Sequence, residues 1–267
     1  MITCRFIGKL GNHMYQTAAT IKLAEQLKTD FVLPTKSHAG HYGDISPDFS
    51  GFSYPFKFQD ISLPTKVQQP TFGYTPISFI DQLKGDIELH GFYQAHQYFD
   101  TIRGELVNKY FKFKDEVIEQ AQKYGITDDS LGISVRRGDY IQLQHNHCVL
   151  SKKFYQDALG KVKDIDKVFF FSDDIPWCKE NCFCSEEDSD MVNFIQDDKW
   201  VQLYMMTQMK RLILSNSTFA WWGGYLNTKA IQVIIPDPWF GPSNDHHDVS
   251  GLYCPNWIRQ KHDRALV

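Results

Sequence analysis

Short apolar segments alternate with helix-like segments throughout the second half of the sequence, and this alternation restricts the fold more than any other feature. The apolar segments are "LGISV" (131–135), "KVFFF" (167–171), "MVNFI" (191–195), "RLIL" (211–214) and "IQVII" (231–235). Helix-like segments lie between them, near 152–163, 175–182, 199–209 and 218–228. Because these strands are apolar along their whole length, the pattern predicts an α/β fold with a parallel sheet covered by helices on both faces.

The first half of the sequence is less regular. We predict strands in "MITCRFIG" (1–8), "DFVLP" (30–34) and "DIELHGF" (86–92), helices over about 12–28 and 114–125, and mostly loop over 36–85. The polar stretch "ITDDS" (126–130) is the expected boundary between the halves. The sequence therefore predicts an N-terminal domain over residues 1–127 and a C-terminal domain over 128–267.

Charge and apolar content exclude several classes of protein. The net charge of −4 argues against a nucleic-acid-binding protein, which usually carries a basic surface. No apolar run has the length of a secretory signal or a membrane span, which predicts a cytoplasmic location. The cysteine-rich stretch "CKENCFC" (178–184) lacks the second ligand pair of a zinc site, so no metal is expected there.

Polar residues follow every predicted strand of the second half. In an open parallel sheet, ligands bind beyond the carboxyl ends of the strands, where these residues should gather. The residues that follow the strands in turn are Arg136, Arg137, Gly138 and Asp139; Ser172, Asp173 and Asp174; Gln196, Asp197 and Asp198; "SNSTF" (215–219); and "PDPWF" (236–240). Convergence of these groups on one edge predicts a binding site.

The stretch "SVRRGDY" (134–140) suggests that the ligand of this site is an anion. Arginine matches phosphate oxygens with two parallel hydrogen bonds, and adjacent strand residues point to opposite faces. Structural ion pairs between the arginines and Asp139 or Asp173 are the alternative interpretation. Asp173 and Asp174 are more simply explained as helix caps or arginine partners than as metal ligands.

Two helix N-termini are further candidates for phosphate binding. Asn216, Ser217 and Thr218 stand where a predicted helix begins, so its free N–H groups and dipole favour an anion. In "GKLGNHMYQ" (8–16) a strand, glycines and a helix follow one another without the spacing of a phosphate-binding P-loop. We expect Asn12 and His13 to project into a cleft between the two domains.

Several motifs together resemble the α-1,2-fucosyltransferases of glycosyltransferase family 11. The motifs are "GKLGNHMYQTAA", "HGFYQAHQYF", "SVRRGDY", "FFFSDDIPWCKEN", "LYMMTQMKRLILSNSTFAWWGGYLN" and "VIIPDPWF". The resemblance implies a GT-B-like fold, in which two Rossmann-like domains face each other across a cleft. It also implies inverting transfer of L-fucose from GDP-fucose to the 2-hydroxyl of a terminal galactose or similar sugar, with no metal or other cofactor.

The resemblance also implies roles for individual residues. Arg137, together with Arg136, resembles the arginine that binds the donor diphosphate, and Asn12 resembles an asparagine close to the transferred fucose. Further donor-binding residues are implied at Asp139, Ser172, Asp173, Asn216, Ser217 and Thr218. The acceptor-side candidates are His13, His90, Tyr93 and Gln94. The partners implied are a nucleotide-sugar donor and a glycan acceptor.

Two positions depart from the family pattern, and several alternatives stay open. Ser134 stands where the family has histidine, and Gln202 stands where it usually has an acidic residue.

His13 is the first candidate for a general base that deprotonates the acceptor hydroxyl, and His90 and His96 are weaker candidates. The alternative functions are transfer with another GDP-sugar or acceptor, a catalytically silent nucleotide-sugar-binding module, and a phosphoryl-transfer enzyme.

Overall fold

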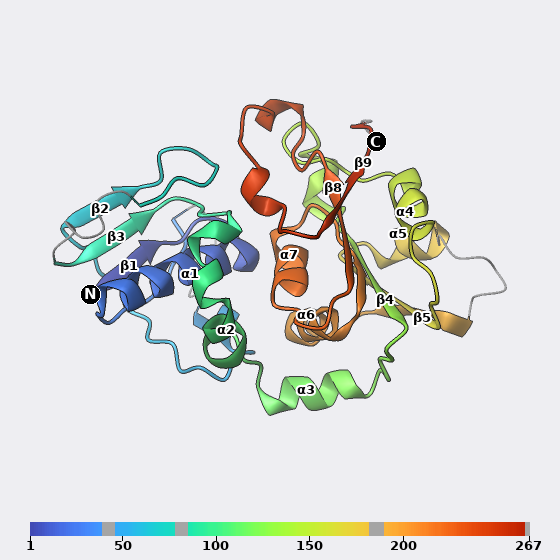
Figure 1. Cartoon of the computed structure of the whole chain (residues 1–267), viewed down its shortest axis with the longest axis horizontal. Coiled ribbons are helices and arrows are strands. Elements are labelled where there is room, and N and C mark those ends of the chain that lie inside the picture. The colour runs from blue at the N-terminus through green and yellow to red at the C-terminus, as the bar shows by residue number, and fades with distance from the viewer. Residues whose placement is uncertain (39–45, 78–84, 182–189, 265–267) are drawn as a thin grey trace. The chain divides into compact units, whose positions relative to one another are not determined.

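The structure is a computed structural model that describes residues 1–38, 46–77, 85–181 and 190–264. It comprises two compact units, Met1–Lys114 with His247–Leu252 and Asp115–His246 with Tyr253–Val267 (Figure 1). Helix α3 (Asp115–Gln122) belongs to the second unit because it packs against helix α6 (Lys199–Gln208). The boundary between the units therefore precedes α3, whereas the sequence suggested 127/128.

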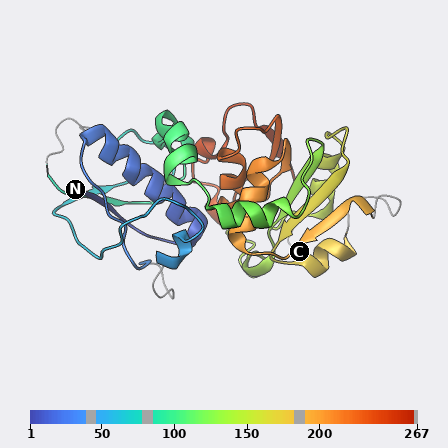
Figure 2. The ribbon, with the colours of Figure 1, turned by 90° about the horizontal axis from the view of Figure 1, so that it is seen from below.

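The first unit contains a parallel sheet in the order β1-β3-β2, with helix α1 packed along it (Figure 2). The elements of this unit are β1 (Ile2–Arg5), α1 (Leu10–Leu27), η1 (Ser46–Phe49), β2 (Thr65–Gln68), β3 (Ile87–His90), η3 (His96–Tyr98), η4 (Asp100–Ile102), α2 (Arg103–Glu105), η5 (Leu106–Tyr110) and η9 (Ser250–Leu252). The strands expected within 1–8 and 86–92 and the helix expected over 12–28 are confirmed.

Two predictions for the first half are wrong. Residues 30–34 form only isolated bridges, because Val32 N–H bonds to Ile2 O and the next N–H, that of Leu33, bonds instead to Lys57 O. Strand β2 lies inside the stretch expected to be loop. Its residues "TKVQ" alternate between half-buried and exposed positions at the edge of the sheet, so the sequence carries little apolar signal for a strand there.

The second unit contains a six-stranded parallel sheet in the order β6-β5-β4-β7-β8-β9. Its remaining elements are β4 (Ser130–Val135), η6 (Gly138–Ile141), α4 (Lys152–Leu159), β5 (Lys167–Ser172), α5 (Ile175–Glu180), β6 (Val192–Ile195), β7 (Arg211–Ile213), α7 (Thr218–Tyr225), β8 (Gln232–Asp237), η8 (Pro242–Asn244) and β9 (Ile258–Lys261). All five predicted strands are confirmed. The sixth strand, β9, was missed because "IRQK" is polar and mostly exposed.

Helices cover both faces of this sheet, as predicted: α4 and α5 lie on one side, and α6 and α7 on the other (Figure 1). Leu131, Ile133 and Val135 of β4 point toward α4 and α5, where they share a core with Phe154 and Cys178. On the other face side chains pack directly against the backbone of β4, since a Cβ at Gly132 would lie 2.6 Å from Met209 Sδ. Residues of β4 thus alternate between two differently packed faces.

The strand order identifies the edge at which a ligand is expected. Numbered from β4, the sheet has the order 3-2-1-4-5-6, in which the direction of strand succession reverses between β4 and β7. Ligands of such sheets bind beyond the carboxyl ends of the strands at this reversal, the switch point. The residues that follow Val135 and Ile213 are therefore the ones that a ligand of this unit would meet.

None of the helices in the described part of the chain combines the length and the apolar character needed to cross a membrane.

Candidate functional site

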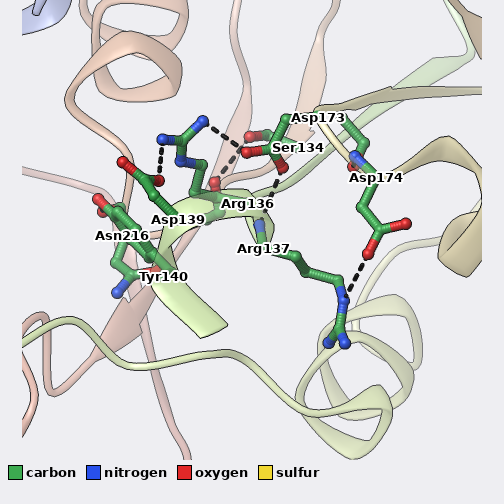
Figure 3. Close-up of polar contacts among 10 residues, drawn as sticks. Ser134, Arg136, Arg137, Asp139, Tyr140, Asp173, Asp174 and Asn216 are labelled. Atoms are coloured by element: carbon green, nitrogen blue, oxygen red, sulfur yellow. Dashed lines mark hydrogen bonds and ion pairs between the residues drawn. The ribbon is translucent and has the colours of Figure 1, made fainter. Parts of the chain in front are cut away.

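The two arginines that follow β4 point in opposite directions (Figure 3). Arg136 Nη1 donates to Asp173 Oδ2 at 2.5 Å, and Arg136 Nη2 pairs with Asp139. The guanidinium carbon of Arg136 also lies 5.1 Å from the centre of the Tyr140 ring. Arg136 therefore extends toward the switch point, and it makes the ion pairs that the sequence allowed as an alternative.

Arg137 instead extends toward helix α5. Its Nε donates to Asp174 Oδ2 at 3.1 Å, and its guanidinium carbon lies 4.2 Å from the centre of the Trp177 ring. Its main-chain N–H donates to Asp173 Oδ1 at 2.9 Å. Only 7% of the residue is exposed. This continues the alternation of β4, in which odd-numbered residues face α4 and α5.

The polar residues after β5 form the turn into α5. Ser172 Oγ accepts from Asp174 N–H at 2.9 Å, and Asp174 Oδ1 accepts from Trp177 N–H at 3.1 Å, which caps the helix. Asp173 and Asp174 thus act as arginine partners and, for Asp174, as a helix cap. This confirms the simpler interpretation of the pair.

The ends of β4 and β7 are joined by hydrogen bonds. Ser134 Oγ and Ser215 Oγ lie 2.8 Å apart, and both residues are buried. Tyr140 Oη donates to Asn216 O at 3.1 Å. Burial raises the pKa of Tyr140 to about 12, so the phenol stays a donor at neutral pH.

Asn216 holds loops together through its side chain. Its Nδ2 donates to Cys148 O at 2.9 Å and to Trp239 O at 3.0 Å. Because only 1% of the residue is exposed, its amide is a structural group, and Asn216 reaches the site through its main chain.

The first main-chain N–H groups of α7 are not capped by the side chain of the N-cap residue. Ser217 is the N-cap residue, but its hydroxyl caps no main-chain N–H, and no residue in the described ranges bonds to the Ser217 or Thr218 hydroxyl. The first N–H groups of a helix need acceptors from outside it. Arg136 and this helix start therefore lie with Tyr140 at the switch point of the sheet, where the helix start has N–H groups that no helical bond uses.

In the first unit, Asn12 and Gln94 lie together. Gln94 Nε2 donates to Asn12 Oδ1 at 2.9 Å, and Asn12 Nδ2 has no hydrogen-bond partner within the described residues. Gly8 precedes them with a φ of +88°, and a Cβ there would collide with the Asn12 amide. The structure thus brings two of the predicted residues together with one amide donor unused.

Two other acceptor-side candidates are buried. His13 is 1% exposed and stacks on Phe6, with 4.6 Å between ring centres. Tyr93 is also 1% exposed; its N–H donates to Gln69 Oε1 and its hydroxyl to Val67 O. Both side chains are thus enclosed by the first unit.

His90 ends β3 and pairs with Glu88. Its Nε2 lies 2.6 Å from Glu88 Oε1, while Glu88 Oε2 accepts from Leu63 N–H at 3.1 Å. Burial alone would raise the pKa of the Glu88 carboxyl, but the hydrogen bonds from His90 and Leu63 outweigh burial and hold this pKa below its ordinary value. His90 Nδ1 has no partner in the part of the chain described here. The arrangement is a histidine oriented by a fixed carboxylate.

The two departures from the family pattern have local partners. Ser134 pairs with Ser215, and Gln202 Nε2 donates to Asp197 O at 2.7 Å. An acidic residue at 202 could not donate that bond. The nearby Asp198 caps α6 by accepting from Trp200 N–H at 2.8 Å.

Within the described ranges, no three His, Cys, Asp or Glu side chains are arranged to hold a metal ion. Cys178 of the predicted cysteine cluster is buried, which raises the pKa of its thiol to about 11. Cys182 and Cys184 lie outside the described residues.

Sequence reasoning missed Tyr140, Trp177 and Glu88. Tyr140 directly follows Asp139, so the motif itself contained it. Trp177 contacts Arg137 only because α5 folds back beside the end of β4. Glu88 is two residues before His90, a spacing that puts both side chains on one face of a strand.

Comparison with known families finds one that matches over more than half of the chain. The model of Glycosyl transferase family 11 matches residues 84–261. The α-1,2-colitosyltransferase of Escherichia coli is 26% identical, with 97% of this chain and 98% of that protein covered. Human galactoside α-(1,2)-fucosyltransferase 1 is 27% identical over 82% of this chain but only 63% of its own length.

Solved structures share the fold. The α-1,6-fucosyltransferase NodZ, soaked with GDP-fucose, superposes with a TM-score of 0.55 at 12% identity and covers 92% of this chain and 96% of its own. POFUT1 in complex with GDP superposes with a TM-score of 0.53 at 12% identity, and the match covers 88% of this chain and 97% of POFUT1. This likeness confirms the predicted GT-B-like α/β class.

Proposed function

The chain belongs to glycosyl transferase family 11, and on that premise we propose that it transfers L-fucose from GDP-fucose to the 2-hydroxyl of a terminal galactose or a similar sugar. The reaction inverts the anomeric centre and needs no metal. Relatives named for α-1,2 transfer and a fold shared with fucosyltransferases support the linkage and the donor. We assign the protein to the cytoplasm.

One observation carries the proposal: Arg136 and the start of α7 present unused donors at the switch point between β4 and β7. As the bond between fucose and GDP breaks, negative charge grows on the leaving diphosphate. Donors that are already in place stabilise this charge without reorganisation. Arg136 and the Ser217–Thr218 helix start supply these donors in our proposal.

We assign the diphosphate contact to Arg136, although the family resemblance put Arg137 first. Arg137 points away from the switch point and is nearly enclosed by α5. Arg136 is paired with Asp139 and Asp173 through one N–H group on each of Nη1 and Nη2. These two carboxylates orient the guanidinium, and its remaining N–H groups meet the diphosphate in our proposal.

Asn12 acts on the sugar side of the donor. Its Oδ1 is occupied by Gln94, which leaves Nδ2 as a donor with a set direction. We propose that this N–H group bonds to the transferred fucose or to the oxygen that leaves with the diphosphate.

We assign His90 as the group that accepts the proton of the acceptor hydroxyl. A carboxylate on one ring nitrogen fixes the orientation and tautomer of the ring, which leaves the other nitrogen directed toward a substrate. His96 also pairs with a carboxylate, that of Asp100, but the Asp100 side chain is 42% exposed, whereas that of Glu88 is 10% exposed. His13 is enclosed in the core.

Calorimetric titration with GDP, UDP and ADP in EDTA tests the donor site. We expect GDP alone to bind. Transfer is then assayed with GDP-fucose and β-galactosides in EDTA. Failure to bind GDP, or binding that needs a divalent metal, would contradict the proposed donor site.

A second candidate is transfer of colitose to the same kind of hydroxyl. It is favoured by the colitosyltransferase, which matches over nearly the whole of both chains. Competition between GDP-fucose and the GDP derivative of colitose decides between the two. GDP binding without transfer from either donor, over a broad acceptor panel, would instead identify a binding module.

A further inference from the structure

Arg137 has an unusual environment for an arginine beside a binding site. Its side chain is 9% exposed, one face of the guanidinium lies on the Trp177 ring, and Nε bonds to Asp174. Trp177 itself packs against the core cluster between the sheet and α4. The guanidinium is therefore a planar group inserted between the end of β4 and helix α5.

Three connections fix the backbone at this point. Asp173 accepts the Arg137 N–H through Oδ1 and the Arg136 guanidinium through Oδ2. Asp174 pairs with Arg137 and also caps α5. Gly138 lies so close to the Asp173 carboxylate that a Cβ there would collide with it. Movement of Arg137 would thus shift Asp173, and with it the guanidinium of Arg136.

We infer that Arg137 is a positioning residue, which acts through its stack on Trp177 to hold Arg136 toward the diphosphate site. This inference rests on the proposed function, since it assumes that Arg136 binds GDP. A guanidinium stacked on an indole moves less than one in water, because both groups are planar and the contact is attractive in a buried setting. Trp177, which contacts no predicted ligand, is then a determinant of donor affinity.

The test uses Trp177→Leu and Trp177→Phe, with Phe194→Leu as the matched control. Phe194 of β6 packs against the same core cluster as Trp177 but contacts neither arginine. Each variant is examined by calorimetry with GDP, by thermal unfolding, and by amide hydrogen exchange of residues 136–139 without ligand.

We expect Trp177→Leu to weaken GDP binding about tenfold, the size of a desolvated cation–π contact, and to speed exchange at 136–139. Trp177→Phe should keep most of the GDP affinity and most of the slow exchange at 136–139, because it keeps an aromatic face. Phe194→Leu should lower the melting temperature about as much as Trp177→Leu does, but it should change neither GDP affinity nor exchange at 136–139. Arg137→Lys keeps the charge but has no planar group to stack on Trp177. We expect it to change GDP affinity and exchange as Trp177→Leu does, and it replaces Trp177→Leu in the test if that variant fails to fold.

Equal effects of Trp177→Leu and Phe194→Leu on GDP affinity would overturn the inference. Unchanged hydrogen exchange at residues 136–139 in Trp177→Leu would also overturn the inference, and this measurement needs no ligand. Absence of GDP binding by the unaltered protein is a different result, because it contradicts the proposed function while the exchange arm still decides whether Arg137 and Trp177 hold the backbone.

Discussion

Tyr140 Oη donates to the main-chain oxygen of Asn216 at 3.1 Å, across 76 residues of sequence. The bond joins the segment after β4 to the segment after β7, and the buried contact between Ser134 and Ser215 joins the ends of the same two strands. Because burial keeps the phenol protonated, the tie persists at neutral pH. The two halves of the proposed donor site are thereby held in one arrangement before any ligand binds.

Replacing Arg136 by Ala should abolish most donor binding with little change in stability. Charge-assisted hydrogen bonds are worth about 1.5–3 kcal/mol each, so loss of the fork should weaken GDP about 100-fold. Its ion pairs are partly exposed and contribute little to folding. Calorimetry and thermal unfolding measure both quantities. A variant that binds GDP as tightly as the parent would rule out Arg136 as the diphosphate ligand.

Replacing Ser217 by Ala should weaken GDP binding a few-fold and leave stability nearly unchanged, because the Ser217 hydroxyl caps no N–H group. Ser151→Ala is the matched control. Ser151 caps α4 by accepting from Phe154 N–H, so its loss should cost about 1 kcal/mol of stability without affecting GDP. If the two variants behaved alike in both measurements, the helix start would have no special role in binding.

The hydroxyl pair of Ser134 and Ser215 should show strong coupling. Either single change to Ala leaves a buried hydroxyl without its partner, at a cost of about 1–3 kcal/mol, whereas the double change removes both groups. The double variant should therefore be less destabilised than the sum of the single variants. Urea denaturation of all four proteins gives the coupling energy. Simple additivity would mean that the two hydroxyls do not depend on each other.

Replacing His90 by Gln should slow transfer while GDP binding stays normal. Positioned general bases contribute about 10²–10⁴-fold in rate, so kcat should fall at least about 100-fold. A variant with near-normal turnover would mean that the acceptor hydroxyl loses its proton without help from His90.

Replacing Glu88 by Gln should reduce stability in a pH-dependent way. The pKa of Glu88 in the folded protein lies below its ordinary 4.5, so the carboxylate contributes stability that is fully present above about 4.5 and is lost as pH falls through the lower folded value. The parent should exceed the variant by about 1–2 kcal/mol at neutral pH and converge with it in acid. Urea denaturation from pH 7 down to 3 measures the difference; a constant gap would contradict this assignment.

Much of the second unit could be predicted from the sequence because its signals are local. Segments such as "KVFFF" and "LGISV" are mostly apolar, with apolar residues at consecutive positions, and helical segments separate them, so strand type and order along the chain follow directly. The placement of Arg136 and Arg137 at a strand end follows from the same pattern. Edge strands β2 and β9 escaped prediction because polar residues line their exposed sides.

What the sequence by itself determined is which residues stand at the ends of strands, and therefore which edge of the sheet carries polar groups. Only the tertiary structure decided what each of these groups contacts. Arg136 and Arg137 are neighbours of the same type, yet Arg136 meets Tyr140, four residues further on, and Arg137 meets Trp177 of the distant α5, because successive residues point to opposite faces. Local periodicity sets the side to which a residue points, but the partner on that side depends on contacts between distant segments.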